Sequence, residues 1–309
     1  MSEAFQWRSE APATVQPLQT WMPQILRRTE QALERYLPSS ELAPKTLHEG
    51  MRYATLGGGK RLRALLCHAA GELVDADPAI LDGAASAIEM IHAYSLVHDD
   101  LPAMDNDLLR RGLPTVHVRY GEAMAILVGD GLQAQAFALI GDLPATAAQR
   151  IALLKELTSA SSSLGMVGGQ AIDLQSVGQV LPREQLEQMH RLKTGALLRA
   201  AVFMGAHCGP ASMSAELHAA LDNYQRAVGL AFQVVDDILD VTTDAATLGK
   251  TPGKDAQYNK PTYVSLLGLE ASRALAEELG ERARAALAPL GEQATHLHEL
   301  ADMVVHRIR

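Results

Sequence analysis

The chain has 309 residues, 48% of them hydrophobic, and a formal net charge of −9. This size allows a large buried core, and the acidic balance argues against sequence-independent binding of nucleic acid, which needs a basic surface. Two cysteines, Cys67 and Cys208, are too few for a disulfide framework or a thiolate zinc site. We therefore expect a reduced, cytoplasmic setting, and the sequence predicts neither a signal peptide nor a membrane span.

Apolar residues recur at spacings of three and four along nearly the whole chain, and aromatic residues make up only 4% of it. This periodicity predicts an all-α protein. The longest polar loop is LGKTPGKDAQYNKP, residues 248–261. No linker or internal repeat divides the chain, so we expect one helical domain over residues 1–309.

Three glycines precede several cations in GGGKRLR, residues 57–63. A glycine turn that leads into a helix offers free N–H groups, and cations beside it suit phosphate. The pattern is not a P-loop, because the second glycine and the Ser or Thr after it are missing. Taken alone, the same residues are typical of a solvated helix cap.

The first acidic cluster follows the segment 84–98, which is apolar on more than one face and is predicted to be a central helix. The cluster, DDLPAMDND, spans residues 99–107. Pro102 disfavours helix at the residue before it, so the helix should end or kink just after Asp100. The helix dipole opposes negative charge at that end, and a bound cation would offset this effect.

The second acidic cluster lies in RAVGLAFQVVDDILDV, residues 226–241, the other predicted central helix. One stripe of this helix carries Gln233, Asp236, Asp237 and Asp240. Neighbouring carboxylates on a buried face repel one another and are costly to desolvate without a positive partner. Oxygen ligands favour a hard cation, and magnesium held by few carboxylates usually shares its shell with substrate phosphates.

Each of these features has an ordinary structural explanation. A single Asp-rich turn is usually solvated surface, although two such clusters on the two most apolar helices favour a metal site. His92 lies two helical turns before Asp99 on nearly the same face, yet a lone histidine on an apolar helix is more often a core residue. Lys193 and Thr194 interrupt another apolar helix, which indicates a functional reason for polar groups there.

The ordered set GGKRLR, DDLPAMD, RRG, GGQAIDL, KTGAL, FQVVDD and DDILD resembles the trans-prenyl diphosphate synthase family, and within it the bacterial farnesyl diphosphate synthases. Any one motif is weak, but the ordered set is specific. The resemblance implies the isoprenoid synthase fold, which is a single large helical bundle with central helices around a deep apolar cavity. It also implies a magnesium-dependent homodimer.

The resemblance further implies residue roles. The metal ligands would be Asp99, Asp100, Asp105, Asp236 and Asp240. They would bind a cluster of three Mg²⁺ ions when substrate is present, with Mn²⁺ able to substitute. The allylic diphosphate would be held by Arg110, Lys193, Lys250 and Lys260. The diphosphate of isopentenyl diphosphate would be held by Gly59, Lys60, Arg63, His92 and Arg111. The catalytic group would comprise Arg110, Lys193, Thr194 and Gln233, the last two facing the reacting carbons.

The implied reaction condenses isopentenyl diphosphate with dimethylallyl and geranyl diphosphate by ionisation, condensation and elimination. Tyr94, with Ser95 beside it, would limit chain growth, since it lies roughly 7.5 Å along the helix axis from Asp99. This favours a fifteen-carbon product; a twenty-carbon product is the alternative. A non-catalytic subunit usually loses its acidic motifs, and a terpene cyclase would lack DDILD and GGKRLR. A pure magnesium- or phosphate-binding protein would not need a deep apolar interior.

Overall fold

The protein is all-α, as predicted. The computed structural model describes residues 16–179, 181–242 and 262–307. The helices are α1 (Leu18–Tyr36), α2 (Lys45–Leu56), α3 (Leu62–Glu72), α4 (Pro78–Asp99), α5 (Val116–Tyr120), α6 (Glu122–Asp142), α7 (Ala147–Ser161), α8 (Met166–Gln175), α9 (Arg183–His190), the π-helical turn η1 (Arg191–Gly195), α10 (Ala196–His207), α11 (Ala215–Thr242), α14 (Tyr263–Leu267), α15 (Leu269–Leu287), the 3-10 segment η2 (Ala288–Ala294) and α16 (Thr295–His306).

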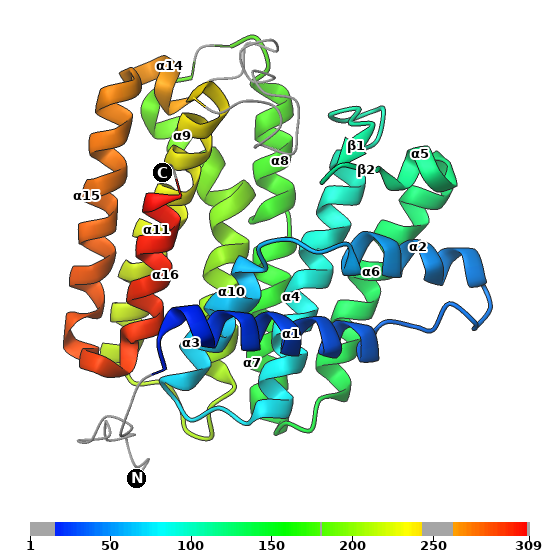
Figure 1. The fold of residues 1–309 in the computed structure, drawn as a ribbon, viewed down its shortest axis with the longest axis horizontal. Coiled ribbons are helices and arrows are strands. Elements are labelled where there is room, and N and C mark those ends of the chain that lie inside the picture. The colour runs from blue at the N-terminus through cyan, green and yellow to red at the C-terminus, as the bar shows by residue number, and fades with distance from the viewer. Residues whose placement is uncertain (1–15, 180, 243–261, 308–309) are drawn as a thin grey trace.

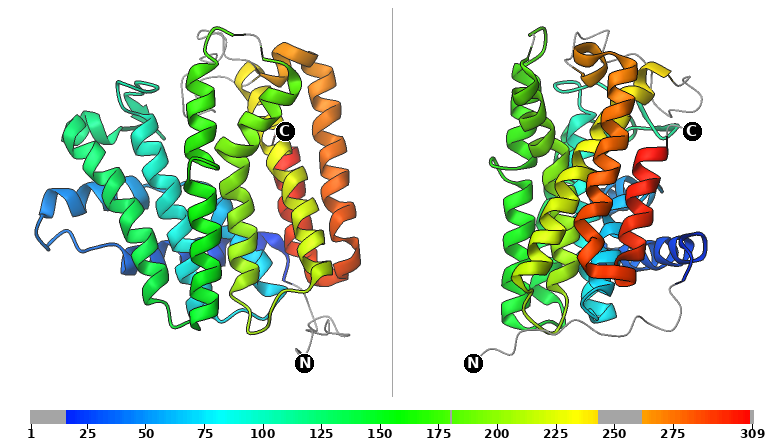
Figure 2. Two further views of the ribbon diagram at one scale, coloured as in Figure 1. Left: turned by 180° about the vertical axis from the view of Figure 1, so that it is seen from behind. Right: turned by 90° about the vertical axis from the view of Figure 1, so that its left-hand side faces the viewer.

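Long helices form the body of the molecule, and α1 lies across them (Figure 1). Seen from the opposite side and from the edge, α4, α8, α10 and α11 run in similar directions (Figure 2). The predicted central helix at 84–98 is part of α4, in which Ile88, Met90 and Ile91 are fully buried. The predicted helix at 226–241 is the C-terminal half of α11, where Val234, Val235 and Ile238 are fully buried. Both helices were therefore identified correctly as core elements.

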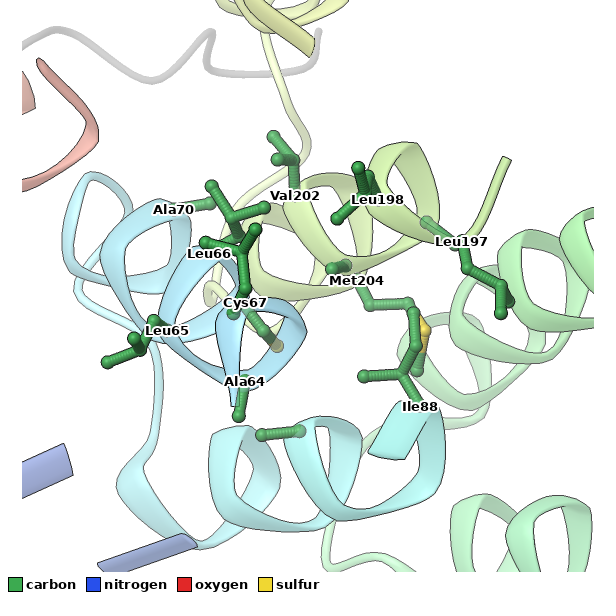
Figure 3. Close-up of a cluster of buried hydrophobic side chains, with 14 of the residues drawn as sticks. Ala64, Leu65, Leu66, Cys67, Ala70, Ile88, Leu197, Leu198, Val202 and Met204 are labelled. Carbon is green, nitrogen blue, oxygen red and sulfur yellow. The ribbon is translucent and has the colours of Figure 1, made fainter. Parts of the chain in front are cut away.

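A cluster of apolar side chains joins α3, α4 and α10, as Figure 3 shows. Small residues let the first and last of these helices approach closely. A Cβ on Gly205 would lie 2.0 Å from the carbonyl oxygen of Cys67, so only glycine fits at this crossing. The close packing fixes α10, and through it the turn η1 that precedes α10, relative to the central helix α4.

One small departure from an all-helical chain lies between the first acidic cluster and α5. Strand β1 (Leu109–Arg110) pairs antiparallel with β2 (Leu113–Pro114). The two residues between them, Arg111 and Gly112, both have positive φ, at 53° and 76°. Positive φ at both positions is the signature of a tight two-residue hairpin turn. Two-residue strands carry too little alternation to be seen in a sequence dominated by helical periodicity.

Helix α6 is both long and strongly apolar. By length and composition alone, it is the one helix of the described residues that could cross a membrane, although only 39% of its most apolar stretch is buried. Core helices of soluble proteins share this composition, and α6 packs against α2, α4 and α5. Its outward face, however, exposes Ile126 and Leu127.

Candidate active site

A cavity of about 590 Å³ opens between α4, α8, η1 and α11. It brings together many of the residues that the sequence singled out, from segments far apart in the chain. Those that line it are Arg63, His92, Tyr94, Ser95, Asp99, Asp105, Lys193, Thr194, Gln233 and Asp236. Apolar side chains such as Met104, Met166, Leu174 and Leu197 complete the wall. The predicted clustering of acidic, basic and apolar groups around one cavity is therefore observed.

The first acidic cluster forms a compact loop at the end of α4. The helix ends at Asp99, as Pro102 predicted, and the chain then folds back on itself. The backbone N–H of Asp105 donates to the carbonyl oxygen of Asp99 at 2.9 Å, and that of Asp107 donates to the carbonyl oxygen of Asp100 at 3.2 Å. The four residues between Asp100 and Asp105 therefore place the carboxylate of Asp105 at the same cavity as that of Asp99.

The electrostatic environment of Asp99 is unfavourable for its charge. Burial raises the pKa of Asp99 to about 6. Lys193 and Arg110 oppose the increase, and the carboxylates of Asp105 and Asp100 add to it. Burial and like charges both disfavour an ionised carboxylate, and a bound cation would relieve both effects.

Asp100 points toward a different partner from Asp99. Its side chain is buried, and its two oxygens accept from Nε of Arg110 at 2.9 Å each, with a third bond from Nη2 to Oδ1 at 2.6 Å. It does not line the main cavity of the described structure. This pairing fixes the Arg110 guanidinium beside the acidic loop, and a metal-binding role for Asp100 stays a prediction.

The second acidic cluster presents only part of its stripe to the cavity. Gln233, Asp236 and Asp237 line it, whereas Asp240 is buried and lies outside the described lining. Asp237 anchors α14, because its Oδ2 accepts from the backbone N–H of Tyr263 at 2.7 Å. Asp236 is therefore the residue of DDILD whose position best suits a ligand in the cavity, and the metal-binding role of Asp240 stays a prediction.

A π-helical turn, η1, presents Lys193 and Thr194 to the cavity. Such turns insert one extra residue into a helix and are frequent at functional sites. The hydroxyl of Thr194 donates to Oε1 of Gln233 at 3.1 Å. The ammonium of Lys193 lies 2.6 Å from Oδ2 of Asp173 on α8. The polar intrusion seen in the sequence is thus a cavity-facing turn.

The predicted phosphate-side cations gather around the glycine loop and the hairpin. Nη1 of Arg111 donates to the carbonyl oxygen of Gly58. Gly59 has φ of +126°, a conformation that favours glycine, and a Cβ there would lie 2.6 Å from Nη2 of Arg111 and displace that guanidinium. The loop therefore holds the Arg111 guanidinium in place.

His92 lies within the field of this cation cluster. Burial lowers the pKa of His92 well below its usual value, and Arg63, Arg111, Arg110 and Arg61 lower it further. Burial also lowers the pKa of Arg63 to about 10. A neutral imidazole surrounded by arginines is an environment that favours an anionic ligand.

Arg61, one of the three cations of the stretch GGGKRLR, has a structural role. Its φ is +47°, and its buried guanidinium contacts Glu30, Glu89 and the carbonyl oxygen of Thr55. Lys60 is exposed, and burial together with Arg307 lowers its pKa, whereas Asp236 raises it. Lys60 and the second acidic cluster therefore influence each other electrostatically.

Several cavity residues were missed by sequence reasoning. Gln170 and Asp173 lie on α8 within the GGQAIDL motif, and His190 precedes the π turn. Burial lowers the pKa of His190 to about 4. Arg307 lies outside the described cavity lining but contacts two residues of it: Nη2 lies 3.4 Å from Oδ1 of Asp236 and donates to the carbonyl oxygen of Phe232 at 2.7 Å. Only GGQAIDL carried a signal, because Gln and Asp interrupt an otherwise apolar segment.

The predicted ligands Lys250 and Lys260 lie outside the described residues. Within the described ranges, no group of three or more His, Cys, Asp or Glu side chains is arranged to hold a metal ion by itself. Asp99 and Asp105 face the cavity from one side and Asp236 from the other. This oxygen-only donor set fits magnesium, which is bound by few carboxylates when substrate phosphates supply further ligands.

The chain belongs to the polyprenyl synthetase family, whose model matches residues 44–295. It is similar to a protein of Sinorhizobium fredii named "Probable farnesyl diphosphate synthase", with 55% identity over 91% of this chain and 85% of that one. The farnesyl diphosphate synthase of Escherichia coli is 48% identical over 91% of this chain and 96% of its own. A crystal structure of a Helicobacter pylori geranyltransferase complexed with magnesium and isoprenyl diphosphate is 31% identical, with a TM-score of 0.84 over 96% of this chain and 99% of that one.

Proposed function

We propose that the protein condenses isopentenyl diphosphate with dimethylallyl diphosphate, and then with geranyl diphosphate, to give farnesyl diphosphate. The observation that carries the proposal is the single cavity on which carboxylates, cations and an apolar wall converge. The carboxylates suit a metal-bound diphosphate, the cations suit a second diphosphate, and the apolar wall suits a hydrocarbon chain. The identity to proteins named farnesyl diphosphate synthase supports the choice of product.

Asp99, Asp105 and Asp236 are the residues proposed to hold magnesium, with Asp100 and Asp240 next to them in the two motifs. When bound there, magnesium supplies positive charge to the departing diphosphate of the allylic substrate. A cluster of three ions, and substitution by Mn²⁺, are part of this proposal. The raised pKa of Asp99 supports it, because a buried carboxylate beside other carboxylates needs a cation.

Lys193 and Arg110 are proposed to bind the allylic diphosphate, together with Lys250 and Lys260. As the allylic C–O bond breaks, negative charge develops on the leaving diphosphate, and these fixed cations stabilise it. Arg110 has five N–H donors, and Asp100 occupies Nε and Nη2, which leaves the Nη1 group for a phosphate. Asp100 therefore orients the guanidinium even without touching the substrate.

Thr194 and Gln233 are proposed to face the allylic cation. The Thr194 hydroxyl donates to Oε1 of Gln233, and Nε2 of Gln233 donates to Oδ1 of Asp237 at 3.4 Å. These two bonds fix the direction of the amide and leave lone pairs of the Thr194 oxygen free. Oxygen dipoles held in this way stabilise developing positive charge without reorganisation during the reaction.

Gly59, Lys60, Arg63, His92 and Arg111 are proposed to bind the diphosphate of isopentenyl diphosphate. The lowered pKa of His92 keeps its ring neutral, so that it can donate one hydrogen bond to an anion. The double bond of this substrate attacks the allylic cation, and the released diphosphate takes the proton that is lost. No nucleophilic side chain is required, and apolar walls keep water from the cation.

Tyr94 and Ser95 are proposed to limit product length. Tyr94 is buried at 6% exposure, and its ring packs edge-on against His98, with centroids 5.6 Å apart. The Ser95 hydroxyl is turned back onto its own helix, donating to the carbonyl oxygen of His92 at 2.8 Å. A rigid aromatic ring below Asp99 limits the space for the growing chain, which favours a fifteen-carbon product over a twenty-carbon product.

We further propose that residues 1–309 form one domain that works as a homodimer in the cytoplasm. The outward face of α6 supports the dimer, because Ile126 is 47% exposed and Leu127 50% exposed. Adjacent exposed apolar residues on a long helix are typical of an interface. Cys67 and Cys208 are buried and free, in keeping with a reduced compartment.

The test is a product assay with purified protein, magnesium, isopentenyl diphosphate and either dimethylallyl or geranyl diphosphate. Products are dephosphorylated and separated by chain length. A dominant fifteen-carbon alcohol is expected. A twenty-carbon product would keep the reaction and overturn the product length, whereas no magnesium-dependent elongation by folded protein would overturn the reaction.

A further inference from the structure

Asp173 is a buried carboxylate that lines the cavity from α8 and has no role in the reaction described above. It is 6% exposed, and its Oδ2 lies 2.6 Å from Nζ of Lys193. Lys193 itself is half-buried in the same cavity wall. The Lys193 ammonium is therefore held on the α8 side of the cavity in the substrate-free protein.

The backbone makes this pairing a fixed feature. Gly169 lies one helical turn before Asp173 on α8 and faces the π turn that carries Lys193. A Cβ on Gly169 would lie 2.2 Å from the backbone nitrogen of Lys193, so the two segments touch through their main chains. The position of Asp173 relative to the Cα of Lys193 is therefore fixed by the packing of the two main chains.

Lys193 also has a second carboxylate within electrostatic reach. Asp99 and Lys193 line the same cavity, and of the neighbouring charges Lys193 acts most strongly on Asp99. A flexible four-carbon stem lets an ammonium choose between nearby anions. Asp99, the carboxylate that the proposed function assigns to magnesium, is therefore an alternative anion on the wall of the same cavity.

We propose that Asp173 is a positioning residue that holds Lys193 on α8, and so keeps Lys193 from occupying the Asp99 carboxylate before magnesium and diphosphate bind. The inference rests on the proposed function. An ammonium has three N–H donors, so Lys193 can keep its bond to Asp173 and still donate to an arriving phosphate. Asp173 thereby separates the two positive partners of the diphosphate, the ammonium and the metal.

The test is a calorimetric titration of magnesium into the full-length protein with inorganic diphosphate present, so that no turnover is involved. Asp173→Asn keeps the side-chain shape and removes the charge that holds Lys193. We expect the magnesium dissociation constant to rise about three- to tenfold. In a Lys193→Gln background there is no ammonium to move, so adding Asp173→Asn should change the constant less than twofold.

Asp82→Asn is the matched control. It also removes one negative charge and breaks an ion pair, with Nε of Arg28 at 2.5 Å, but it lies near the start of α4, roughly 25 Å from Asp99 along the helix axis. It should leave the magnesium constant unchanged. Circular dichroism and thermal unfolding establish that each variant is folded.

Two results would overturn the inference. One is an unchanged magnesium constant in folded Asp173→Asn, and the other is an equal increase with and without Lys193, which would indicate a simple loss of negative charge. Failure of the proposed function looks different. In that case the unchanged protein would bind no magnesium with diphosphate and would form no elongated product.

Discussion

The Thr194 hydroxyl bonds to the Gln233 amide oxygen across the junction of η1 and α11, and the two residues are 39 positions apart in the chain. This bond joins two of the residues proposed to face the allylic cation. It depends on the π turn, because the extra residue of that turn brings Thr194 into the cavity.

Removing this bond should slow the chemical step without unfolding the protein. For Thr194→Val we expect kcat to fall about tenfold or more, because one preorganised dipole is lost and the Gln233 amide becomes free to turn. The measurement is steady-state kinetics with geranyl diphosphate. Thr158→Val is the control, since that hydroxyl bonds only to the backbone of its own helix. Equal loss in both variants would contradict the proposed role.

Replacing Asp99 with a neutral residue should abolish activity and stabilise the fold. The folded-state pKa of about 6 lies above the ordinary value of 3.8, so the ionised carboxylate destabilises the fold at neutral pH. Asp99→Asn should raise the free energy of unfolding at pH 7 without metal by roughly 1 to 3 kcal/mol. The gain should disappear below pH 3.8, where the carboxyl is protonated in both states. Elongation activity should be abolished, and a destabilised variant at pH 7 would refute the electrostatic argument.

The opposite pH dependence is expected at His296, which lies where α1, α3 and α16 meet. Its Nδ1 lies 2.6 Å from Oε2 of Glu72, its Nε2 lies 2.8 Å from the carbonyl oxygen of Gln16, and its ring stacks on Trp21 at 4.2 Å. Burial opposes the charged form, but the bonds to Glu72 and Gln16 prevail and raise the pKa of His296 above 6.5.

A raised folded-state pKa stabilises the protein fully below pH 6.5, and the stabilisation is lost as pH rises through the folded-state value. His296→Gln should therefore destabilise the protein more at pH 6 than at pH 9, by roughly 1 kcal/mol. Urea unfolding at the two pH values is the measurement. Asp302→Asn, at the ion pair of Arg284 with Asp302, is the control and should show no such difference. A pH-independent effect of His296→Gln would count against a charged His296.

Gly59→Ala should weaken isopentenyl diphosphate binding selectively. The added Cβ would displace the Arg111 guanidinium, which lies 2.6 Å away at Nη2. We expect KM for isopentenyl diphosphate to rise about tenfold, as one charge-assisted contact is lost, while KM for geranyl diphosphate changes little. Gly58→Ala controls for backbone strain, because Gly58 also has positive φ but has open space at its Cβ. A similar increase in both constants would argue against a dedicated site.

Tyr94→Ala should lengthen the product. The ring of Tyr94 is 6% exposed and lines the cavity, so its removal opens space below Asp99. Twenty-carbon alcohol should become a major product in the chain-length assay. Val97→Ala, on the same helix and buried but not part of the described cavity wall, should leave the product pattern unchanged. Unaltered products from folded Tyr94→Ala would mean that another residue limits growth.

Much of the site could be predicted because it depends on where helices end and on the helical repeat. Pro102 located the end of α4, and the 3.6-residue repeat placed Gln233 and Asp236 on one face of α11. Both depend on a few local residues, and the apolar surroundings of each cluster indicated burial.

Other features depend on contacts between distant segments, which periodicity does not encode. The side chain of Asp100 pairs with Arg110 because a loop and a hairpin fold back together. Arg61 forms ion pairs with Glu30 and Glu89, although in the sequence it lies between Lys60 and Arg63, which are predicted to bind phosphate. Asp173 acquires its partner Lys193 only through the contact of α8 with η1.

The β1–β2 hairpin places two consecutive arginines in different environments. Arg110 is the last residue of β1 and donates hydrogen bonds to Asp100. Arg111 is the first residue of the turn and donates to the carbonyl oxygen of Gly58. Because the two guanidinium groups share one rigid backbone turn, any tilt of the hairpin moves both of them at once. Under the roles proposed above, Arg110 and Arg111 serve different diphosphates, so one segment of six residues, 109–114, connects the two proposed diphosphate positions.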